Sequence, residues 1–167
     1  IELDSLSSTI LNALNAQIAI IDPSGMVVAY NEQWKLFMDE LQESWSRPSL
    51  NTNLLQSLQA PLTAGNDFAL RLLLWLKDVL GNETSTFETK QQVKLQDQNK
   101  WFHVKVKSLG AEHGAVLIYE DISFQTQSRE YLKETRLKFE KHFNNTFYGI
   151  LVSNQDNKII EANNTAC

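Results

Sequence analysis

The stretch "AIIDPSGMVVAYNEQW", residues 19–34, contains two apolar runs separated by a turn, and the second run ends at an asparagine. The turn residues Asp, Pro, Ser and Gly between two β-branched runs predict a β-hairpin. The side chain of Asn31 can accept a hydrogen bond from the free backbone amides at the start of a helix. The stretch therefore predicts a strand, a tight turn, a second strand and an Asn-capped helix.

The same pattern recurs in "LVSNQDNKIIEANNTAC", residues 151–167. When Asn163 is aligned with Asn31, an offset of 132 residues, the apolar positions and the turn residues of the two stretches coincide. An interval of this length corresponds to a domain and is too long for a solenoid repeat. The sequence therefore predicts one domain followed by the beginning of a second copy.

Helical spacing of apolar residues predicts helices on both sides of the first hairpin. Residues 4–15 carry an apolar stripe four residues apart, and residues 66–81 have an Asn at the start, a strongly apolar face and a Gly at the end. Residues 44–65 are rich in Ser, Asn, Gln and Pro and are expected to form loops with short helical turns. The apolar positions of the first stripe and of the helix after the hairpin are Leu6, Ile10, Leu14, Trp34, Phe37, Met38 and Leu41.

The hydrophobic period changes to two after residue 85. Residues 86–95 and 101–109 alternate apolar with polar side chains, and residues 114–122 form a nearly continuous apolar run that is typical of a central strand. Residues 124–143 are polar, lack Gly and Pro, and predict an exposed helix with a thin apolar seam. The whole pattern predicts an α+β fold: a five-stranded antiparallel sheet with helices on one face.

Composition excludes several classes of function. The chain has 167 residues, a net charge of −5 and one cysteine, Cys167. The negative charge argues against nucleic acid or an anionic membrane as partner, and a single cysteine excludes an internal disulfide and a multi-cysteine zinc site. No apolar run approaches the roughly 20 residues that span a bilayer. No signal peptide is evident. Because Ile1 is not a natural start, we expect a piece of a longer protein.

These elements, in this order, resemble the PAS sensor domain family. The resemblance is carried by "IAIIDPSGMVVAYNEQW", "WFHVKVKSL" and "GAVLIYEDIS" and covers about residues 10–123. Asp121-Ile122-Ser123 is similar to the Asp-Ile-Thr ending of the family, although Ser lacks the methyl group of Thr. The resemblance implies a tandem PAS protein with an N-terminal amphipathic helix (1–15), a PAS domain (16–123), a connector helix (124–145) and the start of a second PAS domain (146–167).

A ligand in such a fold would lie against the inner face of the sheet. Apolar walls with a few polar groups are typical of small-molecule sites, but the same residues can simply fill a core, and the sequence leaves both interpretations open. Asp121, Ile122 and Ser123 are expected to transfer the signal, with Asp121 fixing the connector to the edge of the sheet. The expected ligand-binding residues are Leu72, Trp75, Thr89, Gln91, Phe102, Val104, Leu117 and Tyr119.

The sequence does not name a cofactor. No cysteine precedes Cys167, which excludes flavin-adduct photochemistry, while a non-covalent flavin or a small metabolite remains open as the ligand. His103 is expected to face away from the sheet's inner face, His113 lies in a turn and His142 lies on the connector, so none is expected to bind haem or a metal ion. No phosphate-binding loop or catalytic constellation is evident, and no enzymatic activity is expected of this part of the chain.

The resemblance implies a sensory or regulatory module. The family precedes outputs of the histidine kinase or diguanylate cyclase type in bacterial signalling proteins, and the expected location is cytoplasmic. A homodimer is expected through the N-terminal helix, assisted by a coiled coil of the connector; a rigid single-chain spacer is the competing interpretation of the connector. The alternative function is a purely structural dimerisation module with a filled core and no ligand.

Overall fold

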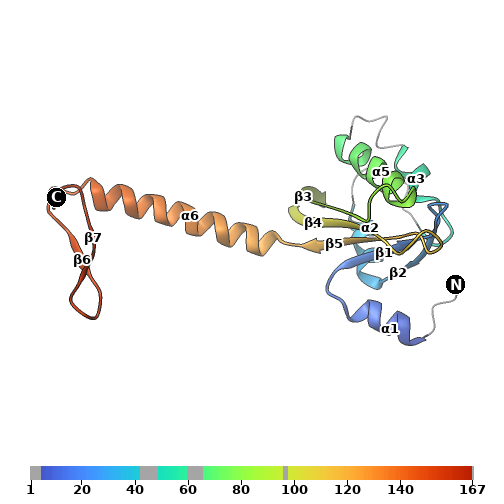
Figure 1. Cartoon of the computed structure of the whole chain (residues 1–167), viewed down its shortest axis with the longest axis horizontal. Helices are drawn as coiled ribbons and strands as arrows, with labels where there is room; N and C mark the ends of the chain where they lie inside the picture. The colour runs from blue at the N-terminus through green and yellow to red at the C-terminus, as the bar shows by residue number, and fades with distance from the viewer. Residues whose placement is uncertain (1–4, 42–48, 60–65, 96–97, 167) are drawn as a thin grey trace. The chain divides into compact units, whose positions relative to one another are not determined.

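The structure, a computed structural model, describes residues 5–41, 49–59, 66–95 and 98–166. The chain divides into two compact units, Ile1–Ser123 and Phe124–Cys167. Each unit is described by itself (Figure 1).

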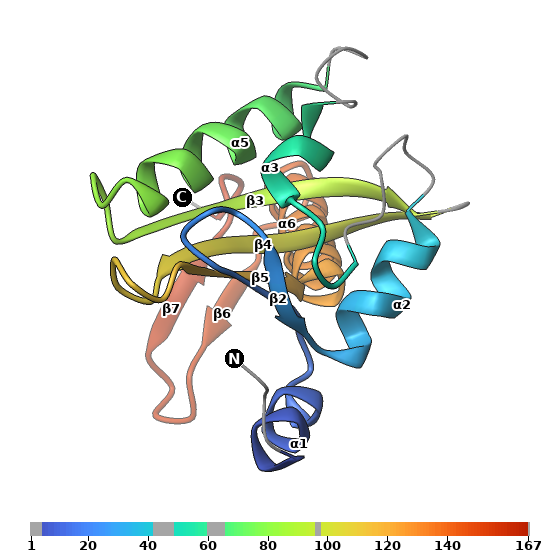
Figure 2. The ribbon, with the colours of Figure 1, turned by 90° about the vertical axis from the view of Figure 1, so that its right-hand side faces the viewer.

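The first unit is built on one five-stranded antiparallel sheet. Its strands have the spatial order β2-β1-β5-β4-β3, so that β5 is central (Figure 2). β1 and β2 form the hairpin predicted from residues 19–34, with a register shift between Ile20 and Ile21. The predicted α+β fold is confirmed. The strands are β1 (Gln17–Ile21), β2 (Val27–Tyr30), β3 (Thr86–Leu95), β4 (Gln98–Ser108) and β5 (Ala115–Asp121).

Helices α2 (Glu32–Glu40), α3 (Leu54–Ser57) and α5 (Asp67–Leu80) lie on one face of the sheet, and α1 (Ser5–Ala13) lies on the other side (Figures 1 and 2). The side chain of Asn66 caps α5 by accepting a hydrogen bond from the backbone amide of Ala69. Gly81 ends α5, and its amide donates to the carbonyl of Lys77. Both ends of α5 therefore follow from signals in the sequence.

The core lies between the helical layer and the inner face of the sheet. Trp34 and Phe37 are buried, whereas Trp75 is only half-buried because it stacks on Phe87 over the edge strand β3, at a ring-centroid distance of 5.5 Å. Alternate residues of β4 and β5 are buried, as the period of two requires. These residues are Phe102, Val104, Val106, Ala115, Leu117 and Tyr119.

One buried amide side chain joins three elements of this unit. Asn31 is 1% exposed, and its Oδ1 accepts hydrogen bonds from the backbone amides of Ile18 (3.0 Å) and Trp34 (3.0 Å). Its Nδ2 donates to the carbonyls of Leu11 (3.1 Å) and Ala16 (2.7 Å). Asn31 therefore links the end of α1, the start of β1 and the first turn of α2.

The second unit repeats this arrangement. It contains α6 (Ser123–Asn144), β6 (Leu151–Ser153) and β7 (Ile159–Ala162), and Asn163 is completely buried. Its Oδ1 accepts from the amides of Ile150 (2.8 Å) and Ala166 (3.0 Å), and its Nδ2 donates to the carbonyls of Phe143 (2.8 Å) and Tyr148 (2.9 Å). Each of these four partners lies 132 residues after the corresponding partner of Asn31, so the sequence repeat is also a repeat of individual hydrogen bonds. Nδ2 of Asn163 donates in addition to Oγ1 of Thr146 (2.9 Å), a bond without a counterpart at Asn31.

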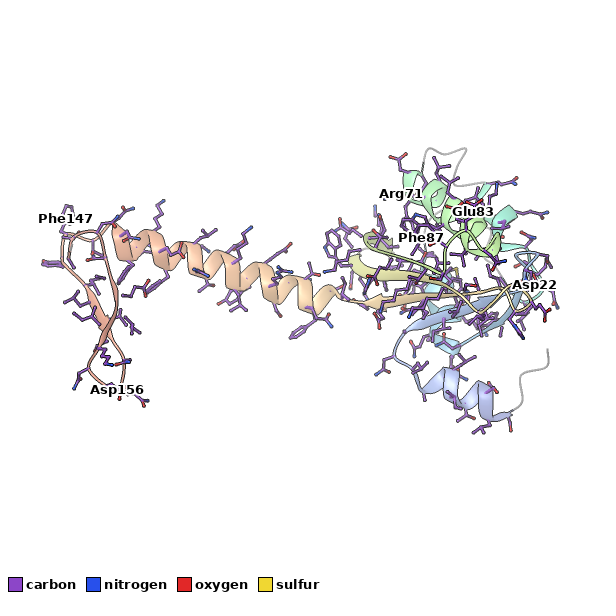
Figure 3. The ribbon with its side chains drawn as sticks, viewed as in Figure 1. Asp22, Arg71, Glu83, Phe87, Phe147 and Asp156 are labelled. Atoms are coloured by element: carbon purple, nitrogen blue, oxygen red, sulfur yellow. The ribbon has the colours of Figure 1, made fainter. Side chains whose placement is uncertain are left out.

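The two hairpin turns agree in the same detail. The carboxylate of Asp22 accepts from the amides two and four residues later, and the amide oxygen of Asn154 does the same. Gly25 has φ +83°, and Asn157, at the matching position, has φ +59°. Asn tolerates the left-handed region better than most residues, so it can replace Gly there. Figure 3 labels Asp22 in the first turn and Asp156 in the second.

Replacing Asn31 with Ala should lower the free energy of unfolding by about 3–5 kcal/mol, because two amides and two carbonyls lose their partner in or near the core. Urea unfolding followed by tryptophan fluorescence measures this loss, since Trp34 is adjacent. Asn12→Ala is the matched control: it removes one exposed hydrogen bond to the amide of Glu32 and should cost less than about 1 kcal/mol. Equal losses in the two variants would contradict the role assigned to Asn31.

Candidate ligand pocket

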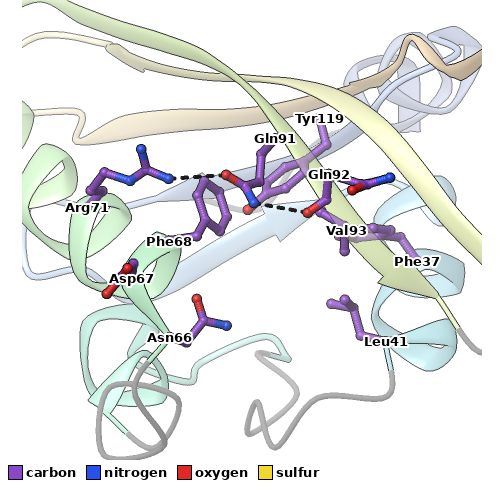
Figure 4. Close-up of a pocket in the computed structure, with 10 residues that line it drawn as sticks. All are labelled: Phe37, Leu41, Asn66, Asp67, Phe68, Arg71, Gln91, Gln92, Val93 and Tyr119. Atoms are coloured by element: carbon purple, nitrogen blue, oxygen red, sulfur yellow. Dashed lines mark hydrogen bonds between the residues drawn. The ribbon is translucent and has the colours of Figure 1, made fainter. Parts of the chain in front are cut away.

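A cavity of about 370 Å³ lies in the first unit between the helical layer and the inner face of the sheet (Figure 4). This size falls within the range of small-molecule sites, roughly 300–1,000 Å³. Its described lining comes from α2 and the residue after it, from the cap and first turn of α5, and from β3 and β5. The lining residues are Phe37, Leu41, Asn66, Asp67, Phe68, Arg71, Gln91, Gln92, Val93 and Tyr119.

Aromatic rings form one wall of the cavity. Tyr119 lies 5.2 Å from Phe37 and 6.5 Å from Phe68, measured between ring centroids, and its contact with Phe68 is edge-to-face at 87°. Leu41 and Val93 add aliphatic surface. The cavity therefore offers flat apolar surfaces that suit an aromatic ring or a short aliphatic group.

Tyr119 also supplies an unused polar group. The residue is 2% exposed and lines the cavity, and its hydroxyl has no hydrogen-bond partner among the described residues. Burial raises the pKa of Tyr119 well above its usual value, so the hydroxyl stays protonated at physiological pH and can donate a hydrogen bond. An acceptor in the cavity would receive a hydrogen bond from this hydroxyl.

Two buried polar atoms near Tyr119 lack partners within the described part of the chain: the indole nitrogen of Trp34 and Oε1 of Gln17. The ring of Trp34 lies 5.9 Å from that of Tyr119. Gln17 faces Tyr119 directly across the β1–β5 pair, so the two side chains share the inner face of the sheet. The surroundings of Tyr119 thus hold one buried donor and one buried acceptor without partners among the described residues.

Polar side chains from α5 and β3 also line the cavity. The guanidinium of Arg71, on α5, donates a hydrogen bond from Nη2 to Oε1 of Gln91 on β3, at 3.2 Å (Figure 4). Gln91 in turn donates from Nε2 to the carbonyl of Gln92, at 3.0 Å. Asp67 precedes Arg71 by one helical turn and also lines the cavity. Arg71 and Asp67 are the charged residues of the described lining.

The structure places the eight residues expected at the ligand site in three groups. Gln91 and Tyr119 line the cavity. Trp75 and Thr89 are half-buried outside the lining, and Trp75 stacks on Phe87. The other four are fully buried core residues: Leu72, Phe102, Val104 and Leu117.

Sequence reasoning placed the site against the middle of α5, whereas the cavity lies at the start of this helix. Phe68 and Arg71 were therefore missed, although they follow the Asn66 cap that the sequence does indicate. Trp75 and Leu76, further along α5, pack in or against the core and do not belong to the described lining. The N-cap signal locates the helix terminus, but only packing shows which end of the helix stands away from the sheet.

The outer face of the sheet carries a cluster of charged residues around His103. Nζ of Lys105 lies 2.8 Å from Oε2 of Glu120, and the two ring nitrogens of His103 lie 3.3 Å from Glu88 and 3.6 Å from Glu120. The hydrogen bond from Lys105 and the nearby positive charges lower the pKa of Glu120, against a smaller effect of burial. The described residues include no group of three or more His, Cys, Asp or Glu arranged to hold a metal ion.

Residues 121–123 hold the end of β5 against β4. Oδ1 of Asp121 accepts from the amide of Ser123 (2.9 Å), and its Oδ2 lies 3.4 Å from Nζ of Lys100. Oγ of Ser123 accepts from the amide of Trp101 (2.9 Å), and the amide of Ile122 donates to the carbonyl of Trp101 (2.8 Å). The contact to β4 is therefore made by the hydroxyl group of Ser123, a group that Thr also has.

None of the described helices is both long and apolar enough to cross a membrane. No family model matches the sequence, and the comparison with curated proteins finds no match.

Solved structures resemble the chain in fold. The PAS domain of BvgS from Bordetella pertussis is 14% identical with a TM-score of 0.50, over 80% of this chain and 96% of that one. The phage VqmA–DPO complex is 11% identical with a TM-score of 0.50, over 77% of this chain and 56% of that one. The sensor region of a sensor histidine kinase is 12% identical with a TM-score of 0.45, over 66% of this chain but only 40% of that one. The chain has the PAS fold.

The Asp121 contacts should make stability depend on pH. Partial burial alone would raise the pKa of Asp121, but the hydrogen bonds from Ser123 and the nearby Lys100 together lower it below 3.8. A lowered folded-state pKa contributes stability above the unfolded value and loses it as pH falls through the folded value. Asp121→Asn should therefore cost about 1 kcal/mol or less at pH 7, since the carboxylate is partly exposed, and this cost should shrink below about pH 4. Urea unfolding at pH 7 and pH 3 measures it; a cost that grows on acidification would contradict the assignment.

Proposed function

We propose that the first unit is a sensory module in which the cavity beside Tyr119 binds a small molecule, and that occupancy of the cavity is passed to α6. The observation that carries this proposal is the cavity itself: buried Tyr119 lines it, and next to Tyr119 two buried atoms, the indole nitrogen of Trp34 and Oε1 of Gln17, have no hydrogen-bond partner among the described residues. A core that served packing alone would be expected to satisfy or omit such groups.

The cavity also argues against a module whose core is completely filled by its own side chains. Such a core would close around α2, α5 and the sheet, as it does around Leu72 and Leu76. At the start of α5 it leaves about 370 Å³ instead. A dimerisation module without a ligand therefore remains the second candidate, with less support.

The route to α6 follows from the position of Tyr119 on β5. Tyr119 precedes Asp121 by two residues, and Asp121 contacts the amide of Ser123, where α6 begins. A ligand that shifts Tyr119 would move the last residues of β5 relative to Trp101 on β4. In this proposal Asp121, Ile122 and Ser123 transfer the signal.

We extend the proposal to a tandem arrangement. The hydrogen bonds of Asn163 repeat those of Asn31, and the hairpin exposes Leu151 and Ile159 at positions where the first unit buries Ala19 and Val27. The second unit would then be the start of a second domain of the same fold. An output of the histidine kinase or diguanylate cyclase type would lie elsewhere in the protein, and we propose no catalytic role for the residues described.

We also propose a homodimer through α1. Leu6, Ile10 and Leu14 are exposed on this helix, and an exposed apolar stripe of this kind is usually covered by a partner. Leu132 and Phe139 of α6 are exposed as well and would assist.

Filling the cavity should abolish ligand binding. Val93 lines the cavity from β3 and is half-buried, so Val93→Trp places an indole in that space. Ile118→Trp, on the outer face of the central strand β5, is the control. Mass analysis of denatured extracts and thermal shifts with a small-molecule panel measure binding; a ligand at about 100 times its Kd stabilises the folded chain by about 2.7 kcal/mol. Equal binding by the wild type and Val93→Trp, or no binding at all by the wild type, would contradict the sensor proposal.

The dimer can be tested separately. Leu6→Asp combined with Ile10→Asp places charges on the exposed stripe of α1 and should convert the dimer to a monomer in multi-angle light scattering. Ser8→Asp combined with Asn12→Asp adds the same charge elsewhere on α1 and should leave the dimer intact. A wild-type monomer at high protein concentration would refute this part of the proposal.

A further inference from the structure

We propose that the ligand of this cavity is an aromatic carboxylate that carries a hydrogen-bond acceptor on its ring, with its carboxylate bound by Arg71 and its acceptor bound by the Tyr119 hydroxyl. This inference rests on the proposed sensor function. It adds the chemical class of the ligand and a distinct role for each of the two residues.

The ring is assigned from the wall of the cavity. Three aromatic side chains meet there: Phe37, Phe68 and Tyr119, with centroid distances from Tyr119 of 5.2 and 6.5 Å. Edge-to-face and tilted contacts of this kind leave ring faces and edges available to a further aromatic ring. An aromatic body therefore gains more from this wall than a flexible alkyl chain, which also loses rotamer freedom on binding.

The carboxylate is assigned from Arg71. Arg71 is the one cationic residue of the described lining, and among the described residues its guanidinium donates one hydrogen bond, to Oε1 of Gln91. The amide oxygen of Gln91 is a neutral acceptor, and it lies where a ligand oxygen could accept a hydrogen bond from the guanidinium of Arg71. A carboxylate would replace it with two parallel, charge-assisted hydrogen bonds, which the planar guanidinium favours. The start of α5 adds a positive helix dipole on the same side.

The negative charge of Asp67 repels an anionic ligand, and this repulsion limits where the carboxylate of the ligand can lie. It is exposed and lies one helical turn before Arg71, on the same side of the cavity. The carboxylate of the ligand must therefore lie closer to Arg71 and Gln91 than to Asp67. Removing the two charges should have opposite effects on affinity, which a contribution from shape alone would not produce.

The acceptor on the ring is assigned from Tyr119. Tyr119 is a buried residue of the aromatic wall, and its protonated hydroxyl has no hydrogen-bond partner among the described residues, whereas Arg71 reaches the cavity from α5 (Figure 4). A ligand with a carboxylate alone would leave the hydroxyl unsatisfied. A nitrogen or oxygen on the ring of the ligand would accept a hydrogen bond from the Tyr119 hydroxyl.

The test uses 3-pyridylacetate, with 3-pyridylacetamide and phenylacetate as matched probes, in isothermal titration calorimetry of the whole chain at pH 8. The amide should bind about tenfold or more weakly than the acid, because a hydrogen bond to a charged group contributes more than one to a neutral group. Arg71→Gln should weaken the acid by about tenfold to a hundredfold and remove its preference over the amide.

Three variants complete the design. Lys77→Gln removes the same charge from α5 at a residue that does not line the cavity, and it should leave the affinity for the acid unchanged. Asp67→Asn should tighten binding of the acid several-fold without affecting the amide. Tyr119→Phe should abolish the preference for 3-pyridylacetate over phenylacetate, while both acids keep their dependence on Arg71.

Equal affinity for the acid and the amide, equal effects of Arg71→Gln and Lys77→Gln, or no binding of any probe would overturn the proposed ligand class. The sensor proposal would still stand if a different compound bound the wild type and was lost in Val93→Trp. Absence of any ligand in the broad panel would end both proposals.

Discussion

The fold of the first unit depends on one buried primary amide. Asn31 is both donor and acceptor, and its four hydrogen bonds reach α1, β1 and α2. Few side chains can replace it: a carboxylate lacks the two N–H donors, and a hydroxyl has only one. Because the partners are backbone groups, the contact places the chain itself and does not depend on which side chains surround it. The same geometry at Asn163 shows that this amide organises the local structure wherever the surrounding pattern recurs.

The position of α2 follows from this amide, and the cavity follows from α2. Asn31 caps α2 through the amide of Trp34, and the next turn brings Phe37 against Tyr119 and Phe102. α5 approaches the sheet through Leu72 and Leu76 and remains apart from α2 at its first turn, where Phe68 and Arg71 face the gap. Phe37 and Tyr119 belong to the core and also line the cavity, together with Phe68. A ligand there would contact the core directly through Tyr119.

The two faces of the sheet serve different purposes. The inner face combines buried apolar residues with the few polar groups of the cavity. The outer face of β3, β4 and β5 carries Lys105, Glu120, His103 and Glu88 in mutual contact, and such partly exposed pairs contribute little to stability. Strand β5 belongs to both regions, since Tyr119 faces the cavity and Glu120 faces the opposite side. Its last residue, Asp121, then contacts Ser123 and Lys100 at the end of the strand.

The sequence by itself determined the strands, the caps and the repeat, because each depends on residues close together in the chain. The period of two in residues 86–95 and 101–109, the Asn66 cap and the recurrence of Asn31 at Asn163 are local signals, and the structure agrees with them. The buried alternation of Phe102, Val104, Leu117 and Tyr119 follows from the same pattern.

Only the tertiary structure decided which of these residues line a cavity. Gln91 and Tyr119 do, whereas Leu72 and Val104 pack in the core, because the space between α5 and the sheet depends on how the helix is inclined over several strands. Arg71 is exposed on its helix and carries no sequence signal for a site; it becomes part of one only because β3 brings Gln91 to within 3.2 Å of its guanidinium.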